Sequence, residues 1–356
     1  MKNNELNFIG QDFYIGIDVH KKSWDLTIRS NGLKIKEFSM NPSPKQLSKY
    51  LNKNYPNGNY FSAYEAGFSG FWADRQLRAL GINNIVVNPA DVPSRSKERR
   101  RKNDRIDSGK LSRELSVGNL EGIYIPTKEE ESLRILVRLR EQLKKDQTRQ
   151  KNRIKSLLNF IGVKLSEDIE TKHWSKIYIA ALRELPIEQA ETKQALNELL
   201  DNLENIRIQI ARIIKDLREK VFSEAEVKRI MVFLLSVPGV GFITAITFYS
   251  EIFDIKRFKK LDELAAYIGL APAVYSSGQK EKVLGLSKQR NKYLRNLLIE
   301  STWVAIRQDP ALQMSYGKLC KKMPATKAII KMSKKLLNRM RHVWIQEEKY
   351  VLSVVE

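Results

Sequence analysis

The chain has 356 residues, and its 63 Lys and Arg residues outnumber its 41 Asp and Glu residues to give a formal net charge of +22. At roughly 100–200 residues per domain this length predicts two or three domains, and an apolar content of 42% excludes a disordered protein. Such a positive surplus attracts polyanions, so nucleic acid is the expected partner and an anionic membrane surface is the alternative.

The first third of the chain predicts an α/β domain with a mixed sheet. The first strand is a nearly continuous apolar run, the second alternates apolar and polar residues, and a Ser-Asn-Gly turn separates the second strand from the third. The expected order is β-β-β-α-β-α-β, with elements at residues 13–18, 24–29, 33–38, 42–54, 59–66, 70–81 and 82–90.

Four acidic residues suggest a metal site in this domain. Asp18 closes the first strand and Glu65 closes the fourth. Asp104 and Asp107 are three residues apart in KNDRIDSGKLSREL, which places both on one face of a helix. Four unpaired carboxylates would repel one another, and Mg²⁺ would relieve that repulsion. The alternative is structural: Asp18 caps a strand end and Asp104 caps a helix.

A basic run lies directly before Asp104 and Asp107. SRSKERRRKNDR contains Arg99, Arg100, Arg101 and Lys102. Charge runs are usually solvated or disordered. Because this run lies beside acids that would otherwise repel DNA, we favour a role in positioning phosphates.

The middle of the chain, residues 127–221, predicts two long helices that could pair as an antiparallel hairpin or with a second subunit. Gln147 and Gln150 interrupt the first apolar seam, either to fix its register or because they are exposed. Pro186 is expected to begin the second helix. The second seam comprises Leu196, Leu199, Leu203, Ile206, Ile210, Ile213 and Leu217. Its heptad spacing predicts a coiled coil, which we interpret as an oligomerisation element.

The last third begins with a helix, a Pro-Gly-Val-Gly turn and another helix. The amides of Gly239 and Gly241 could bind phosphate at the second helix, as in a helix-hairpin-helix element. The alternative is a buried helical corner.

Two adjacent serines follow, at Ser276 and Ser277. Several cations crowd them, including Lys280, Lys288 and Arg290. No histidine lies nearby, so a phosphate-binding loop is the simpler interpretation and a nucleophile the alternative. A helix is expected over 282–307, with Leu294, Leu297, Leu298 and Trp303 facing inward.

Motifs from all three regions together resemble one family. They are GIDVHKKSWDLTI, YEAGFSG, KNDRIDSGKL, VPGVGFITA, LAAYIGLAP, SSGQK and GLSKQRNKYLRNLL. The resemblance is to the DEDD insertion-sequence transposases of the IS110 family, which are related to the Piv/MooV invertases. It implies a RuvC/RNase H-like domain at 1–126, a coiled-coil insert at 127–224, and a helical transposase domain at 225–356.

The resemblance also implies chemistry and partners. It makes Asp18, Glu65, Asp104 and Asp107 the DEDD acids that bind Mg²⁺. It makes Ser277, which precedes a glycine, the nucleophile that forms a phosphoserine link to DNA. The active site would be shared between subunits of a tetramer, a dimer of dimers. A bridge RNA would select the donor and target DNA.

Two departures from the family accompany this resemblance. Gly278-Gln279 stands where Gly-Gly is common, and residues 287–290 read Ser-Lys-Gln-Arg where Ser-Lys-Arg-Gly is common.

The rival functions are a metal-dependent nuclease or junction resolvase without a covalent intermediate, and a non-catalytic nucleic-acid scaffold.

The expected location is the bacterial cytoplasm, at the nucleoid. Cys320 is the only cysteine, which excludes an internal disulfide and a Cys/His zinc site. The first residues show no signal-peptide pattern, and no run of about 18 apolar residues predicts a membrane span.

Overall fold

The computed structural model describes residues 7–93, 104–167, 173–277, 280–286 and 291–352. Contacts divide the chain into two compact units, Met1–Ile125 and Pro126–Glu356, which are described separately below.

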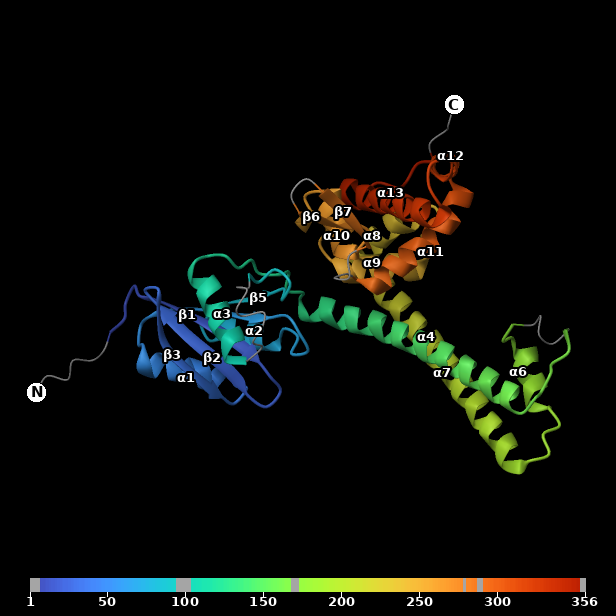
Figure 1. Ribbon diagram of the computed structural model, residues 1–356, viewed down its shortest axis with the longest axis horizontal. Coiled ribbons are helices and arrows are strands. Elements are labelled where there is room, and N and C mark those ends of the chain that lie inside the picture. The colour runs from blue at the N-terminus through green and yellow to red at the C-terminus, as the bar shows by residue number, and fades with distance from the viewer. Residues whose placement is uncertain (1–6, 94–103, 168–172, 278–279, 287–290, 353–356) are drawn as a thin grey trace, which may run out of the picture. The chain divides into compact units, whose positions relative to one another are not determined.

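The first unit is a five-stranded mixed sheet with helices on both faces (Figure 1). Its strands, in the sheet order β3-β2-β1-β4-β5, are Leu33–Met40, Trp24–Ser30, Asp12–Val19, Asn59–Glu65 and Asn83–Val87. Its helices are α1 (Pro44–Asn54), α2 (Trp72–Ala79) and α3 (Asp104–Ser116). β1 pairs antiparallel with β2 and parallel with β4. The predicted order of elements and the mixed α/β class are both confirmed.

The faces of this sheet follow from the alternation of side chains along β1. Phe13, Ile15 and Ile17 are fully buried in one apolar cluster with side chains from α1 and α2. Gly16 lies between two of them and faces α3. Because successive strand residues point to opposite faces, α1 and α2 cover one face and α3 covers the other.

The second unit begins with a long helical hairpin. α4 (Lys128–Phe160) starts at a capping box made by Thr127 and Glu130, and α7 (Ala190–Ser223) returns alongside it (Figure 1). α6 (Lys176–Arg183) packs at the far end of the hairpin. The two helices therefore pair within the chain.

The expected start of the second helix was wrong, and the structure decides between the two alternatives for the glutamines. α7 starts at Ala190, because Pro186 lies in a segment without helical hydrogen bonds. Gln147 and Gln150 are buried, so the exposure alternative fails. The Gln150 side-chain amide donates to the Leu199 carbonyl at 3.0 Å, which ties the register of α4 to that of α7.

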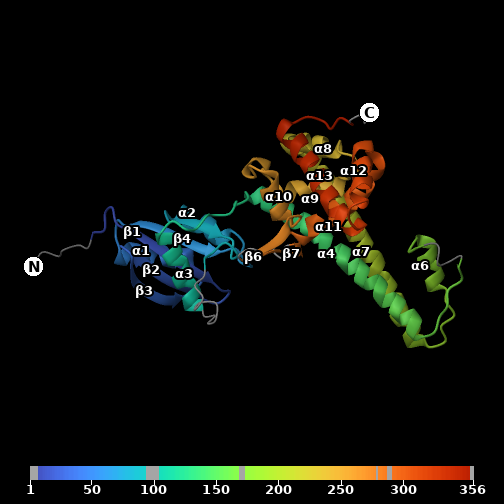
Figure 2. The ribbon, with the colours of Figure 1, turned by 45° about the horizontal axis from the view of Figure 1, so that its top comes forward.

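The remaining helices of the second unit form a cluster in which α9 is buried along most of its length (Figure 2). They are α8 (Ala225–Leu235), α9 (Phe242–Ile252), a 3-10 turn (Ile255–Arg257), α10 (Leu261–Ile268), α11 (Lys292–Gln308), α12 (Pro310–Cys320) and α13 (Ala325–Gln346). α4 is joined to α9 by an ion pair. Arg138 donates to both carboxylate oxygens of Glu251 at 2.8 Å, and the Glu251 side chain is 2% exposed.

The helix expected from residue 282 begins ten residues later, at Lys292. Residues 280–286 instead form β7 (Lys280–Leu286), which pairs antiparallel with β6 (Pro272–Ser277). Leu294 and Leu298 are buried as expected. Trp303 is 42% exposed, so the prediction that it faces inward was wrong. Its ring contacts Tyr316 of α12 edge-on, with 5.6 Å between centroids. No helix in the described part of the chain is long and apolar enough to cross a membrane.

Candidate active site

The carboxyl ends of two neighbouring parallel strands carry the first two predicted acids. The register of β1 and β4 places Ile17 beside Tyr64. Asp18 and Glu65 are the next residues on their strands, so their backbones lie side by side at one edge of the sheet. Their side chains are 22% and 34% exposed, which leaves both carboxylates accessible.

A close backbone contact fixes α3 against these strands. A Cβ atom at Gly16 would lie 2.5 Å from the Ser112 amide nitrogen and closer still to the Ser108 carbonyl oxygen, so only glycine fits. Ser108 also shares a buried 3.0 Å hydrogen bond with Thr27 of β2. These contacts hold the first turn of α3, which carries Asp107, over the strands that end in the two acids.

Basic side chains already contact both strand-end acids. The His20 Nε2 atom lies 3.1 Å from the Asp18 carboxylate, and the Lys110 ammonium lies 3.6 Å from that of Glu65. Lys110 is 8% exposed, so it compensates part of the site's negative charge from a nearly buried position. Sequence reasoning missed both residues. The signal for Lys110 was its spacing of three from Asp107, which places it on the same helical face.

The fit of this site to a metal rests on the donor types. Asp18, Glu65 and Asp107 offer carboxylate oxygens, the ligands that Mg²⁺ prefers. As they stand, however, the described side chains include no group of three His, Cys, Asp or Glu residues arranged to hold a metal ion. The backbone of Asp104 begins α3, but its side chain lies outside that set. Metal binding would therefore require these side chains to move closer together, and the ion would compete with His20 for Asp18 and with Lys110 for Glu65.

The serines lie at the end of a two-stranded ladder in the second unit. β6 ends at Ser277 and β7 begins at Lys280. The register places Ser277 opposite Lys280 and Ser276 opposite Glu281. The two candidate nucleophiles therefore have cross-strand neighbours of opposite charge.

The glycines of the predicted phosphate-binding turn have different surroundings. The Gly239 amide donates to the Gln308 side chain at 2.9 Å. A Cβ atom on Gly239 would lie 2.5 Å from the Ala305 nitrogen, and its φ of +79° also favours glycine. Gly241 caps α9 and has open space around it. Gly239 thus lets the turn pack against α11, and phosphate binding by either glycine stays a prediction.

Several predicted DNA contacts lie outside the described residues. They are Arg99, Arg100, Arg101, Lys102, Lys288 and Arg290.

Two family models of transposases match this chain. Residues 15–163 match a family model of DEDD transposases, and residues 231–317 match the model described as "Transposase IS116/IS110/IS902 family". The putative transposase y4rJ of Sinorhizobium fredii is 33% identical over 281 residues, which span 72% of this chain and 69% of the relative. The chain belongs to the IS110 family of transposases.

Other relatives of this transposase carry similar names. The transposase for insertion sequence element IS1111A of Coxiella burnetii is 29% identical, over 65% of this chain and 62% of its own length. The transposase for insertion sequence element IS1328 of Yersinia enterocolitica is 26% identical over 86% of each chain. The protein is therefore an enzyme that cleaves and rejoins DNA, and its DEDD domain suggests a RuvC-like fold and a dependence on divalent metal.

Proposed function

We propose that this transposase cleaves DNA by attack of the Ser277 hydroxyl on a phosphodiester bound at the acidic end of β1 and β4. The observation that carries the proposal is the placement of Asp18 and Glu65 on adjacent strand ends, beneath the α3 turn that carries Asp107. We include Asp104, one turn earlier on α3, as the fourth ligand. Bound Mg²⁺ would polarise the phosphodiester and stabilise the leaving oxygen.

The proposed reaction conserves the energy of the broken bond. A bond forms between Ser277 Oγ and phosphorus, the bond from phosphorus to the 3′ oxygen breaks, the serine proton leaves, and the 3′ oxygen takes up a proton. A 3′-hydroxyl from the exchanged strand then attacks the phosphoserine and returns a proton to the serine. Rejoining therefore needs no external energy source.

The hairpin register supports Ser277 over Ser276. The backbone register pairs Ser277 with a cationic residue, Lys280, and Ser276 with an acidic one, Glu281, and a nearby cation favours a developing alkoxide. A cation there would also favour an approaching phosphate. In this proposal the cation takes the place of a histidine in activating the serine.

We propose further that the acids and the serine that act on one phosphodiester come from different subunits of a tetramer. The exposure of α7 supports pairing with another subunit, because Ile206 and Ile210 of the predicted seam are only half-buried and Ile208 is 57% exposed. In this proposal residues 127–224 act as a separate oligomerisation module.

We also propose that a bridge RNA selects the donor and target DNA, with the Piv/MooV invertases sharing the cleavage chemistry. The net charge of +22 supports a large amount of bound nucleic acid. Recognition by base pairing would leave the protein to bind backbones rather than read sequence.

A denaturing adduct assay tests the chemistry. The full chain is incubated with end-labelled donor and target DNA and Mg²⁺, with and without the candidate bridge RNA, then denatured and resolved. We expect a protein–DNA adduct in wild type and in Ser276→Ala, and none in Ser277→Ala, in Asp18→Ala or after chelation of Mg²⁺.

Two outcomes would redirect the proposal. Cleavage that persists without an adduct in Ser277→Ala would identify a metal-dependent nuclease instead. An adduct that forms equally well without RNA would remove the guide from the reaction.

A further inference from the structure

One region of the second unit has an unusual charge distribution. Between Asp309 and Glu347 the chain contains no Asp or Glu residue, and α12 and α13 fall within this stretch. Its nine cations are Lys318, Lys321, Lys322, Lys327, Lys331, Lys334, Lys335, Arg339 and Arg341. This short stretch therefore supplies a large share of the protein's positive surplus.

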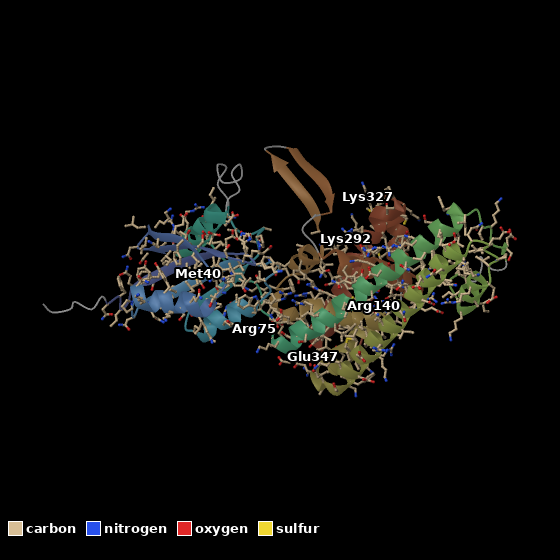
Figure 3. The ribbon with its side chains drawn as sticks, turned by 90° about the horizontal axis from the view of Figure 1, so that it is seen from below. Met40, Arg75, Arg140, Lys292, Lys327 and Glu347 are labelled. Atoms are coloured by element: carbon tan, nitrogen blue, oxygen red, sulfur yellow. The ribbon has the colours of Figure 1, made fainter. Side chains whose placement is uncertain are left out.

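Helix packing forces many of these cations onto one side of α13. The opposite side is buried, and it comprises Ala328, Ile329, Met332, Ser333, Leu336, Leu337, Met340, Val343 and Trp344. Lys327, labelled in Figure 3, begins the exposed side, which continues through Lys331, Lys335 and His342. Successive spacings of four, four and seven residues keep these side chains in one stripe.

The stripe borders a groove of about 550 Å³ beside the start of α10. Its lining residues are Leu261, Lys331, Lys334, Lys335, Asn338 and Arg339. Two of these cations are already paired. Arg339 binds the buried carboxylate of Asp309, and Lys334 binds the exposed carboxylate of Asp262.

The lysines of the stripe have no such compensation. Lys335 donates to the Ser315 hydroxyl at 3.0 Å, which leaves its charge in place. Among the residues that the structure describes, Lys327 and Lys331 form no ion pair. Lys327, Lys331 and Lys335 are also successive neighbours at a spacing of four, where like charges destabilise a helix by about 0.2–0.5 kcal/mol per pair.

Several lysines of the hairpin helices are compensated by an acid four residues away. On α4, Lys145 lies 3.6 Å from Glu141, and on α7, Lys215 lies 3.7 Å from Glu219. Lys220 of α7 likewise pairs with Glu224, four residues on. These three lysines thus each have an acid at a spacing of four, whereas Lys327, Lys331 and Lys335 have none at a spacing of three or four.

We propose that the α10–α13 groove is a binding site for the phosphodiester backbone of a nucleic acid, contacted by Lys327, Lys331 and Lys335. The three ammonium groups repeat about every 6 Å along the helix axis, and a nucleic acid strand offers one negative charge per about 3.4 Å of its own axis. The groove holds the backbone without reading bases. This proposal rests on the proposed function only in taking nucleic acid as the ligand, and it needs neither the DEDD acids nor Ser277.

Salt-dependent binding tests the groove. The full wild-type chain and the triple variant Lys327→Gln, Lys331→Gln, Lys335→Gln are titrated by fluorescence anisotropy in EDTA, where a metal-dependent cleavage cannot proceed. The probes are a 30-base-pair DNA duplex and a 30-nucleotide single-stranded RNA, each at several salt concentrations. The matched control is Lys145→Gln, Lys215→Gln, Lys220→Gln, which removes the same charge from helices with interleaved acids.

The expected result is a change in the slope of log affinity against log salt. Each lost phosphate contact should reduce the slope by about 0.9 for the duplex and about 0.7 for the single strand. The groove variant should thus lose a slope of about 2 to 3 with the probe that occupies the groove, and the control should lose much less. A loss with DNA alone, with RNA alone or with both supports the proposal and names the occupant.

Two results would overturn it. Equal losses in the groove and control variants would mean that only overall charge matters. Unchanged nucleic-acid binding, together with lost binding to anionic phosphatidylserine vesicles, would make the groove a membrane contact. Because no cleavage is measured, failure here leaves the proposed chemistry of Ser277 untouched.

Discussion

Replacing Gly16 by alanine should displace α3 from the sheet whose strands carry Asp18 and Glu65. The added methyl group would lie 2.5 Å from the Ser112 nitrogen and closer still to the Ser108 carbonyl oxygen, whereas real Cβ atoms stay beyond 3.0 Å. Both neighbours are backbone atoms, so no side chain can rotate away. The helix must retreat by about 1 Å, and overpacking of this kind costs about 1–3 kcal/mol of stability.

The same displacement would move Asp107 away from the strand ends. A misplacement of about 1 Å in a reacting centre can cost on the order of 100-fold in rate. We therefore expect Gly16→Ala to cleave DNA about 100-fold more slowly in single-turnover assays at saturating Mg²⁺. The assay temperature is one at which circular dichroism shows the variant folded.

Gly109→Ala, on the same helix, is the matched control. The nearest atom to its added Cβ is Thr27 Oγ1, at 3.8 Å. Alanine at this helical position should keep the cleavage rate and raise stability by about 0.5–1 kcal/mol. If Gly16→Ala unfolds at the wild-type denaturant concentration and cleaves at the wild-type rate, the contact does not position α3 as argued.

Three further substitutions probe single contacts. Lys110→Met leaves the Glu65 carboxylate without its cation. The melting temperature without Mg²⁺ should therefore be lower than in wild type, and Mg²⁺ should raise it by more. An unchanged response to Mg²⁺ would contradict this. Arg138→Met strands the buried carboxylate of Glu251 and should cost about 3 kcal/mol in chemical denaturation, whereas the double variant with Glu251→Leu should recover much of the loss. Burial raises the pKa of Tyr249 from 10.0 to about 12. The neutral phenol therefore favours the folded state fully below pH 10, and this contribution is lost as the pH rises toward 12. Tyr249→Phe should flatten the fall in melting temperature over that window, and parallel curves for the two proteins would refute it.

The strands of the first unit were predictable because their signal is local. Alternation of apolar and polar residues, with a turn between Ser30 and Leu33, marks hairpin strands without knowledge of their partners. The positions of Asp18 and Glu65 at strand ends followed directly. Their proximity depended on β1 and β4 being neighbours, which is a property of the sheet rather than of either segment.

The errors in the second unit have non-local causes. Residues 280–286 contain the short apolar run Val-Leu-Gly-Leu, which periodicity alone does not assign to helix or strand. Pairing with β6 decides in favour of a strand. Gln150 is buried because the Leu199 carbonyl of another helix accepts its amide, and no pattern within α4 indicates that partner.

The register of β6 and β7 also has a consequence for the robustness of catalysis. Side chains alternate along a strand, so a slip of one residue exchanges the two faces of the ladder. Such a slip would move Ser276 into the place that the present register gives to Ser277. Under the proposed mechanism, the identity of the attacking serine is thus a property of strand alignment, and inserting or deleting one residue between Ser277 and Lys280 should be able to transfer that role to the neighbouring hydroxyl.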